Sequence, residues 1–117
     1  MKLEDIAREL GLAELTPEIS AGREADIGRG YASDLLSDVL AHAPEGALLV
    51  TLQVHLNVIA VASHAELAAV VFAGGRRPED DVVAKALAEG IALYSTPADT
   101  FEVVGRLYAL GVKGSHA

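Results

Sequence analysis

The chain has 117 residues, of which 51% are hydrophobic and 4% aromatic, with 17 acidic side chains against 9 basic ones and no cysteine. This length and apolar content predict one domain with an aliphatic core, and the net charge of −8 argues against binding to nucleic acid or to an anionic membrane. The lack of cysteine excludes disulfides, thiolate metal ligands and thiol catalysis.

The N-terminal part is expected to contain one helix and little sheet. Apolar residues three and four positions apart predict a helix over residues 3–10 that ends at Gly11. Residues 12–15 form a short candidate strand. The stretch 18–30 is polar and rich in glycine, and its centre, residues 25–27, is interpreted as an extended edge segment. No apolar run has the length of a signal peptide or a membrane span, so we expect a cytoplasmic protein.

From residue 33 onward, helices alternate with apolar strands. Ser33 is predicted to cap a helix that runs to Leu40. Unbroken apolar runs predict strands that are covered on both faces, over residues 47–51, 67–72 and 91–95. The helices that follow them are expected at 58–65 with Asn57 as N-cap, at 78–89 with Pro78 in the first position, and from Thr96 as N-cap to Gly111, with Phe101, Val104, Leu107 and Tyr108 on one face.

This order of elements predicts the fold class. A strand followed by a helix, three times in succession, requires a parallel sheet with helical crossovers. We therefore predict an α/β fold over residues 1–117, a single compact domain with a mostly parallel sheet, short right-handed helical crossovers and a frayed tail from residue 113. The apolar faces of the predicted helices 34–40 and 58–65 exceed what one small sheet needs to cover, which predicts a homodimer.

The carboxyl ends of the predicted strands are the expected ligand site, because loops there lead into helix N-termini. The loop Gly74-Gly75-Arg76-Arg77 is the most suggestive, since glycines let a backbone approach an anion and arginine adds a fork of donors. The other interpretation is a glycine-rich turn whose arginines are solvated or pair with residues 79–81, and it is preferred because no lysine and hydroxyl of a phosphate-binding motif follow. The remaining candidate ligand-binding residues are Ser33, Asp34, Thr51, Gln53, His55, Asn57 and Thr96.

Catalytic and metal-binding patterns are missing from the sequence. There is no P-loop, no dinucleotide-binding glycine pattern and no nucleophile elbow. Ser33-Asp34 and Ser37-Asp38 are interpreted as helix caps and solvated acids. The four histidines lack the spacing of metal ligands and are interpreted as ordinary surface residues: His42, His55, His64 and His116. We predict no cofactor and no catalytic residue.

Three stretches carry a family resemblance: GYASDLLSDVLAHAPEGALLVTLQVHLNVIAVA, AAVVFAGG and GIALYSTPADTFEVVGRLY. They resemble the DRTGG domain family, and more narrowly its stand-alone members that accompany iron-only hydrogenase genes and are labelled by similarity to the N-terminal part of HPr kinase/phosphorylase. Gly74 and Gly75 match the two glycines of the family motif, whereas Val54, His55 and Ala73 stand where its Asp, Arg and Thr occur.

The resemblance covers about residues 3–112 and implies a compact α/β domain with a regulatory or dimerising role. The family domain also occurs beside CBS domains in regulated pyrophosphatases. Kinase activity is not implied, because that chemistry belongs to a separate P-loop domain. We therefore expect a non-catalytic regulatory or assembly module, homodimeric and accessory to a hydrogenase or related redox complex. The alternative is a sensor that binds an anionic metabolite or adenine nucleotide at the strand carboxyl ends.

Overall fold

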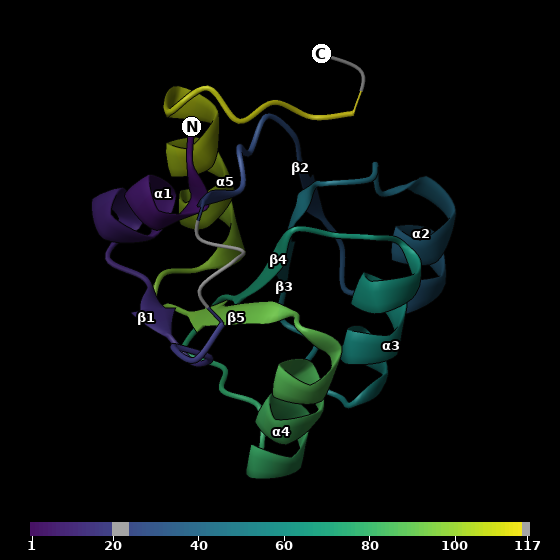
Figure 1. Cartoon of the computed structure of the whole chain (residues 1–117). Helices are drawn as coiled ribbons and strands as arrows, with labels where there is room; N and C mark the ends of the chain where they lie inside the picture. Colours follow the sequence, from purple (N-terminus) through teal and green to yellow (C-terminus); the bar gives the residue numbers. More distant parts are fainter. Residues whose placement is uncertain (20–23, 116–117) are drawn as a thin grey trace.

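The computed structural model describes residues 1–19 and 24–115 (Figure 1). Residues 20–23 of the predicted polar stretch, and residues 116–117 with His116, lie outside the described residues. In chain order the elements are α1 (Leu3–Leu10), β1 (Ala13–Glu14), β2 (Gly30–Ala32), α2 (Leu36–His42), β3 (Leu48–Thr51), α3 (Asn57–His64), β4 (Ala69–Phe72), α4 (Asp80–Glu89), β5 (Ala92–Ser95) and α5 (Thr100–Ala109).

The strands form one sheet in the order β1-β5-β4-β3-β2. Strands β2 to β5 are parallel, and the short β1 pairs with β5 in the antiparallel direction. The predicted α/β class with a mostly parallel sheet is confirmed. Strand β2 was missed by the sequence analysis, which placed polar loop at Gly30 and a helix from Ser33. Residues 25–27 are not a strand of this sheet; Asp26 instead forms an isolated bridge with Lys2.

Helices cover both faces of the sheet (Figure 1). On one face, Leu48 and Val50 of β3 pack with α1 and α5. On the other face, Leu49 of β3 packs with α2, α3 and α4. The side chains of β3, β4 and β5 are buried throughout, because successive residues point to opposite faces and each face is covered.

Four predicted helix starts were placed too early or on the wrong residue. Helix α2 begins at Leu36, and Ser33 accepts a hydrogen bond from Leu35 N (3.2 Å) instead of capping the helix. Asn57 is the first residue of α3 and not its N-cap, and α4 begins at Asp80, two residues after Pro78. The N-cap of α5 is Asp99, whose carboxylate accepts from Glu102 N (2.9 Å), whereas Thr96 accepts from Ala98 N in the preceding turn (3.2 Å).

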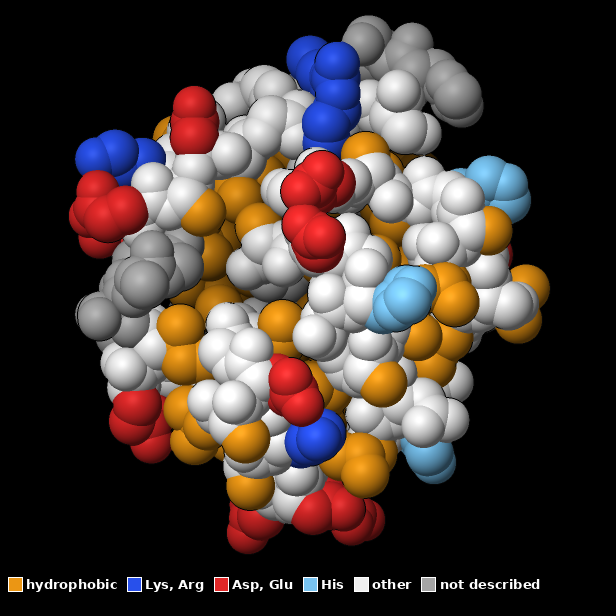
Figure 2. Space-filling model, turned by 45° about the vertical axis from the view of Figure 1, so that its right-hand side comes forward, with side chains coloured by type: hydrophobic (Ala, Val, Ile, Leu, Met, Phe, Trp, Pro, Cys, Tyr) orange, Lys and Arg blue, Asp and Glu red, His pale blue; other side chains and the backbone are white. Residues whose placement is uncertain are grey.

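The predicted apolar faces were correct in part. Val58, Ile59 and Ala62 of α3 are fully buried, so their apolar surface belongs to the core. On α5 the buried residues are Val103 and Leu107, whereas Phe101, Val104 and Tyr108 are exposed. Around α2, Leu35 and Leu40 are also exposed, and the surface on this side shows scattered hydrophobic side chains among polar ones (Figure 2).

The tail was predicted to be frayed from residue 113, but its first residue has hydrogen-bonded backbone. Lys113 N donates to Gly28 O (3.1 Å) and Gly30 N donates to Lys113 O (2.8 Å), so Lys113 is paired beside β2. No helix within residues 1–19 and 24–115 has both the length and the apolar character needed to cross a membrane.

Candidate functional site

The candidate site lies along the edge of the sheet where the carboxyl ends of β2 to β5 meet, which we call the rim. The parallel order places the loops after these four strands at the same edge. The sequence analysis expected three of these loops there, and the loop after β2 is an addition. The loops contribute residues 33–35, 52–56, 73–79 and 96–99. All the predicted site residues lie on the rim or at the strand and helix ends next to it.

In one half of the rim, which we call the β2–β3 half, a carboxylate links the loops that follow β2 and β3. Asp34 Oδ1 accepts hydrogen bonds from Thr51 Oγ1 (3.1 Å) and from Leu52 N (2.7 Å). Thr51 is fully buried, and its Oγ1 also accepts from Gln53 N (3.0 Å). Asp34 therefore joins the loop after β2 to the end of β3, and the two loops have a fixed relative position.

In the other half, which we call the β4–β5 half, backbone amides link the loops that follow β4 and β5. Gly74 N donates to Ala98 O (2.7 Å) and Gly75 N donates to Thr96 O (2.9 Å). Both glycines have positive φ, +67° and +73°, a conformation that side chains other than glycine adopt at a cost. A ligand that used these two amides, as the sequence analysis suggested, would have to displace both loop-to-loop bonds.

The two arginines after the glycines are exposed. Arg77 lines a pocket of about 210 Å³ together with Gly75 and Thr96. In the part of the chain that the structure describes, no ion pair joins Arg76 or Arg77 to the acids at 79–81, so the alternative of an arginine pairing with these acids is not observed. Arg77 is therefore the arginine that could reach an anion at the rim.

His55 organises the start of α3. Its Nδ1 accepts from Asn57 N (3.1 Å), which satisfies one of the free amides of the first helical turn. The imidazole also lines a second rim pocket, about 460 Å³ in volume, together with Gln53, Glu79 and Asp81. Among the described residues there is no group of three His, Asp or Glu side chains arranged to bind a metal ion.

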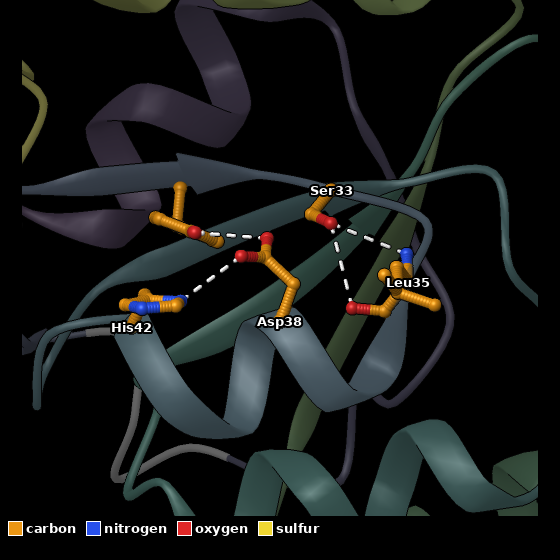
Figure 3. Close-up of polar contacts among 5 residues, drawn as sticks. Ser33, Leu35, Asp38 and His42 are labelled. Atoms are coloured by element: carbon orange, nitrogen blue, oxygen red, sulfur yellow. Dashed lines mark hydrogen bonds and ion pairs between the residues drawn. The ribbon is translucent and has the colours of Figure 1, made fainter.

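A polar cluster on α2 was missed by the sequence analysis. Tyr31 Oη donates to Asp38 Oδ2 (2.8 Å), and His42 Nδ1 lies 3.0 Å from Asp38 Oδ1 (Figure 3). The tyrosine hydroxyl, followed by Ser33 and His42, lowers the pKa of the Asp38 carboxyl, and the same carboxylate raises the pKa of Tyr31. Asp38 and His42 are four positions apart on a helix, a spacing that places them together. Tyr31 lies in β2, a strand that the sequence did not predict, so its contact with Asp38 could not be predicted either.

Comparison with known proteins places the fold. No protein-family model matches the chain, and no curated protein matches it. One solved structure that is similar is the crystal structure of the CBS and DRTGG domains of the regulatory region of Clostridium perfringens pyrophosphatase, complexed with its activator diadenosine tetraphosphate. The TM-score is 0.75 at 18% sequence identity, and the match covers 95% of this chain and 47% of that one. The predicted DRTGG-type fold is confirmed. The chain spans about half the length of that regulatory region.

Proposed function

We propose that the chain is a non-catalytic regulatory module, cytoplasmic and homodimeric, that accompanies a hydrogenase or related redox complex. The observation that supports a non-catalytic role is that the polar side chains of the rim make hydrogen bonds between its loops. The Asp34 carboxylate is bonded to Thr51 and Leu52, and Ser33 Oγ accepts from Leu35 N, so these two residues do not form a nucleophile and base. The likeness to a pyrophosphatase regulatory region supports a regulatory role.

The outer face of α5 supports the homodimer. Phe101 is 89% exposed, Tyr108 53% and Val104 38%, and the spacing of three and four positions places them on one side of the helix. We call these three residues the α5 stripe. Aromatic side chains anchor protein interfaces, and exposed apolar stripes on small domains mark contacts between subunits. This stripe replaces the apolar face of α3 as the proposed dimer contact, because the α3 residues are buried in the core.

Light scattering tests the dimer. At high micromolar concentration the wild-type chain is expected at twice its monomer mass, and Phe101→Ser is expected at the monomer mass because it removes the central apolar anchor of the stripe. Leu56→Ser is the matched control, since Leu56 is an exposed apolar residue in the loop before α3, outside the stripe and outside the predicted helix faces. A monomeric wild-type chain contradicts the dimer. Co-purification with a hydrogenase complex tests the partner, which is supported by the sequence resemblance alone.

A second function is favoured by the pocket beside Arg77. In this proposal the rim binds an anionic metabolite or an adenine nucleotide through Arg77 and Thr96, and the activator of the pyrophosphatase regulatory region is itself a dinucleotide polyphosphate. Differential scanning fluorimetry with adenine nucleotides, acetyl phosphate and phosphosugars tests it. A ligand at about one hundred times its Kd adds about 2.7 kcal/mol of stability. Arg77→Gln should abolish the shift and Arg76→Gln should retain it; no shift with any of these compounds contradicts the proposal.

A further inference from the structure

A separate pocket lies between β2 and α5, and it contains none of the candidate rim residues. Its volume is about 320 Å³, and we call it the β2–α5 pocket. Residues 30–32 and Val50 line it from the sheet, Val104, Leu107 and Tyr108 line it from the helix, and residues 112–115 border it.

The pocket exists because β2 presents small residues on this face of the sheet. The partly buried Tyr31 side chain packs against the core cluster of the opposite face, which contains Val39 of α2 and Ile59 of α3, so Gly30 and Ala32 are left to face α5. Neither has a side chain large enough to fill the space under the helix. At Gly30 an added Cβ would lie 3.2 Å from Val112 Cγ1, so this position tolerates little beyond glycine.

The charge of this pocket is opposite to that of the chain. Among the described residues that line it, Lys113 is the one with a charged side chain, and none of them carries a carboxylate. The rim pocket beside His55, by contrast, contains Glu79 and Asp81. Lys113 Nζ lies 3.8 Å from the centroid of the Tyr108 ring and 3.4 Å from Tyr108 O. No ion pair of Lys113 with a carboxylate is formed within the described residues.

We propose that the β2–α5 pocket binds a small carboxylate whose body is one or two aromatic rings. The rings lie against Val50, Val104 and Leu107, and the carboxylate pairs with the half-buried Lys113 ammonium at the border of the pocket. Ligand pockets of about 300–1,000 Å³ are typically apolar with a few polar groups that fix orientation, and this pocket fits that description. The inference goes beyond the proposed function, because it requires neither the dimer nor a ligand at the rim. Val104 and Tyr108 belong both to the pocket lining and to the α5 stripe, so a dimer formed through the stripe would compete with the ligand.

A titration of the full chain with 2-naphthoate, followed by amide NMR shifts, tests the site. We expect saturable shifts at residues 30–32 and 112–115. Lys113→Gln should weaken 2-naphthoate binding by about tenfold, a difference of about 1.4 kcal/mol, and should leave binding of the uncharged analogue 2-naphthalenemethanol unchanged. Lys85→Gln is the matched control, because it removes the same charge from α4, where Lys85 pairs with Glu89.

A second variant tests the shape of the pocket. Ala32→Leu fills the space under α5 and should abolish binding of both compounds, with circular dichroism verifying that the variant is folded. No saturable binding of 2-naphthoate at millimolar concentration, shifts at the rim in place of β2, or equal weakening by Lys85→Gln would each overturn the inference. Phe101 does not line the pocket, so Phe101→Ser, which removes the dimer contact, should bind 2-naphthoate at least as tightly as the wild type. Failure of the dimer proposal and failure of this one therefore give different results.

Discussion

The two halves of the rim fix their loops by different chemistry. In the β2–β3 half, a side-chain carboxylate bonds to the neighbouring strand end, through Asp34 to Thr51 and Leu52. In the β4–β5 half, the amides of Gly74 and Gly75 bond to carbonyls of the next loop. The first arrangement depends on an acidic side chain, and the second on a backbone conformation that favours glycine. The first half should therefore respond to side-chain deletion, and the second to an added Cβ.

The largest effect is expected from Gly74→Val. Its φ of +67° is unfavourable for any β-branched residue, and the new Cβ would lie 3.1 Å from Leu52 Cδ2. We expect the free energy of unfolding to fall by about 2–3 kcal/mol, measured by urea denaturation. Gly28→Val is the control, because Gly28 does not have a left-handed φ and a Cβ there has no atom within 4 Å. Equal losses in the two variants would show that the positive φ does not matter.

A smaller loss is expected from Asp34→Ala. The variant leaves the buried Thr51 hydroxyl and the Leu52 amide without their acceptor. Because Asp34 is exposed and water can replace part of the bonding, we expect a loss of about 1 kcal/mol in the free energy of unfolding. Asp34→Asn retains one acceptor oxygen and should recover part of the loss. Identical results for the alanine and asparagine variants would contradict a hydrogen-bonding role.

The smallest effect is a change in pH dependence in the Tyr31→Phe variant. The Tyr31 hydroxyl is the main reason why the pKa of Asp38 lies below its ordinary value of 3.8. A lowered pKa in the folded state stabilises the protein above pH 3.8, and that contribution is lost as the pH falls through the folded-state pKa.

Urea denaturation between pH 6 and pH 3 measures this dependence. The wild-type chain should lose stability below about pH 4, and Tyr31→Phe should lose less, because its Asp38 pKa is closer to the ordinary value. Tyr108→Phe is the control and should keep the wild-type slope, since Tyr108 lies on α5 and makes no bond to Asp38. A steeper slope in Tyr31→Phe would contradict the assignment.

The sequence was sufficient to predict the central strands of the sheet but not its edge strand β2. Strands β3, β4 and β5 were predicted because both faces are covered, which leaves unbroken apolar runs. Strand β2 has three residues, one of them glycine, and is half exposed, so its strand character comes from pairing with β3. The β2–α5 pocket could not be predicted for the same reason.

At the rim, the sequence predicted which residues gather but not what they bind. The predicted parallel strands were enough to bring Thr51 and Thr96 to one edge, whereas Asp34 reaches it because it follows the unpredicted strand β2. The sequence analysis chose Thr96 as the N-cap of α5, and the structure has Asp99, which is also a capping residue, so local sequence alone does not fix this helix start. The bond from Asp34 to Thr51 joins residues 17 positions apart, and local patterns carry no signal for such a contact.

Because β1 pairs with β5, the N-terminal elements can reach their final packing only late in synthesis. Ala13 pairs with Ser95, Thr16 Oγ1 accepts from Leu93 N, and Arg106 donates to Glu9 O. The apolar side of α1 packs in the same core cluster as Val103 and Leu107, so its burial is incomplete until those residues have left the ribosome. A nascent chain that stalls before residue 93 would therefore expose apolar residues of the α1 segment, which are a target for chaperones and proteases.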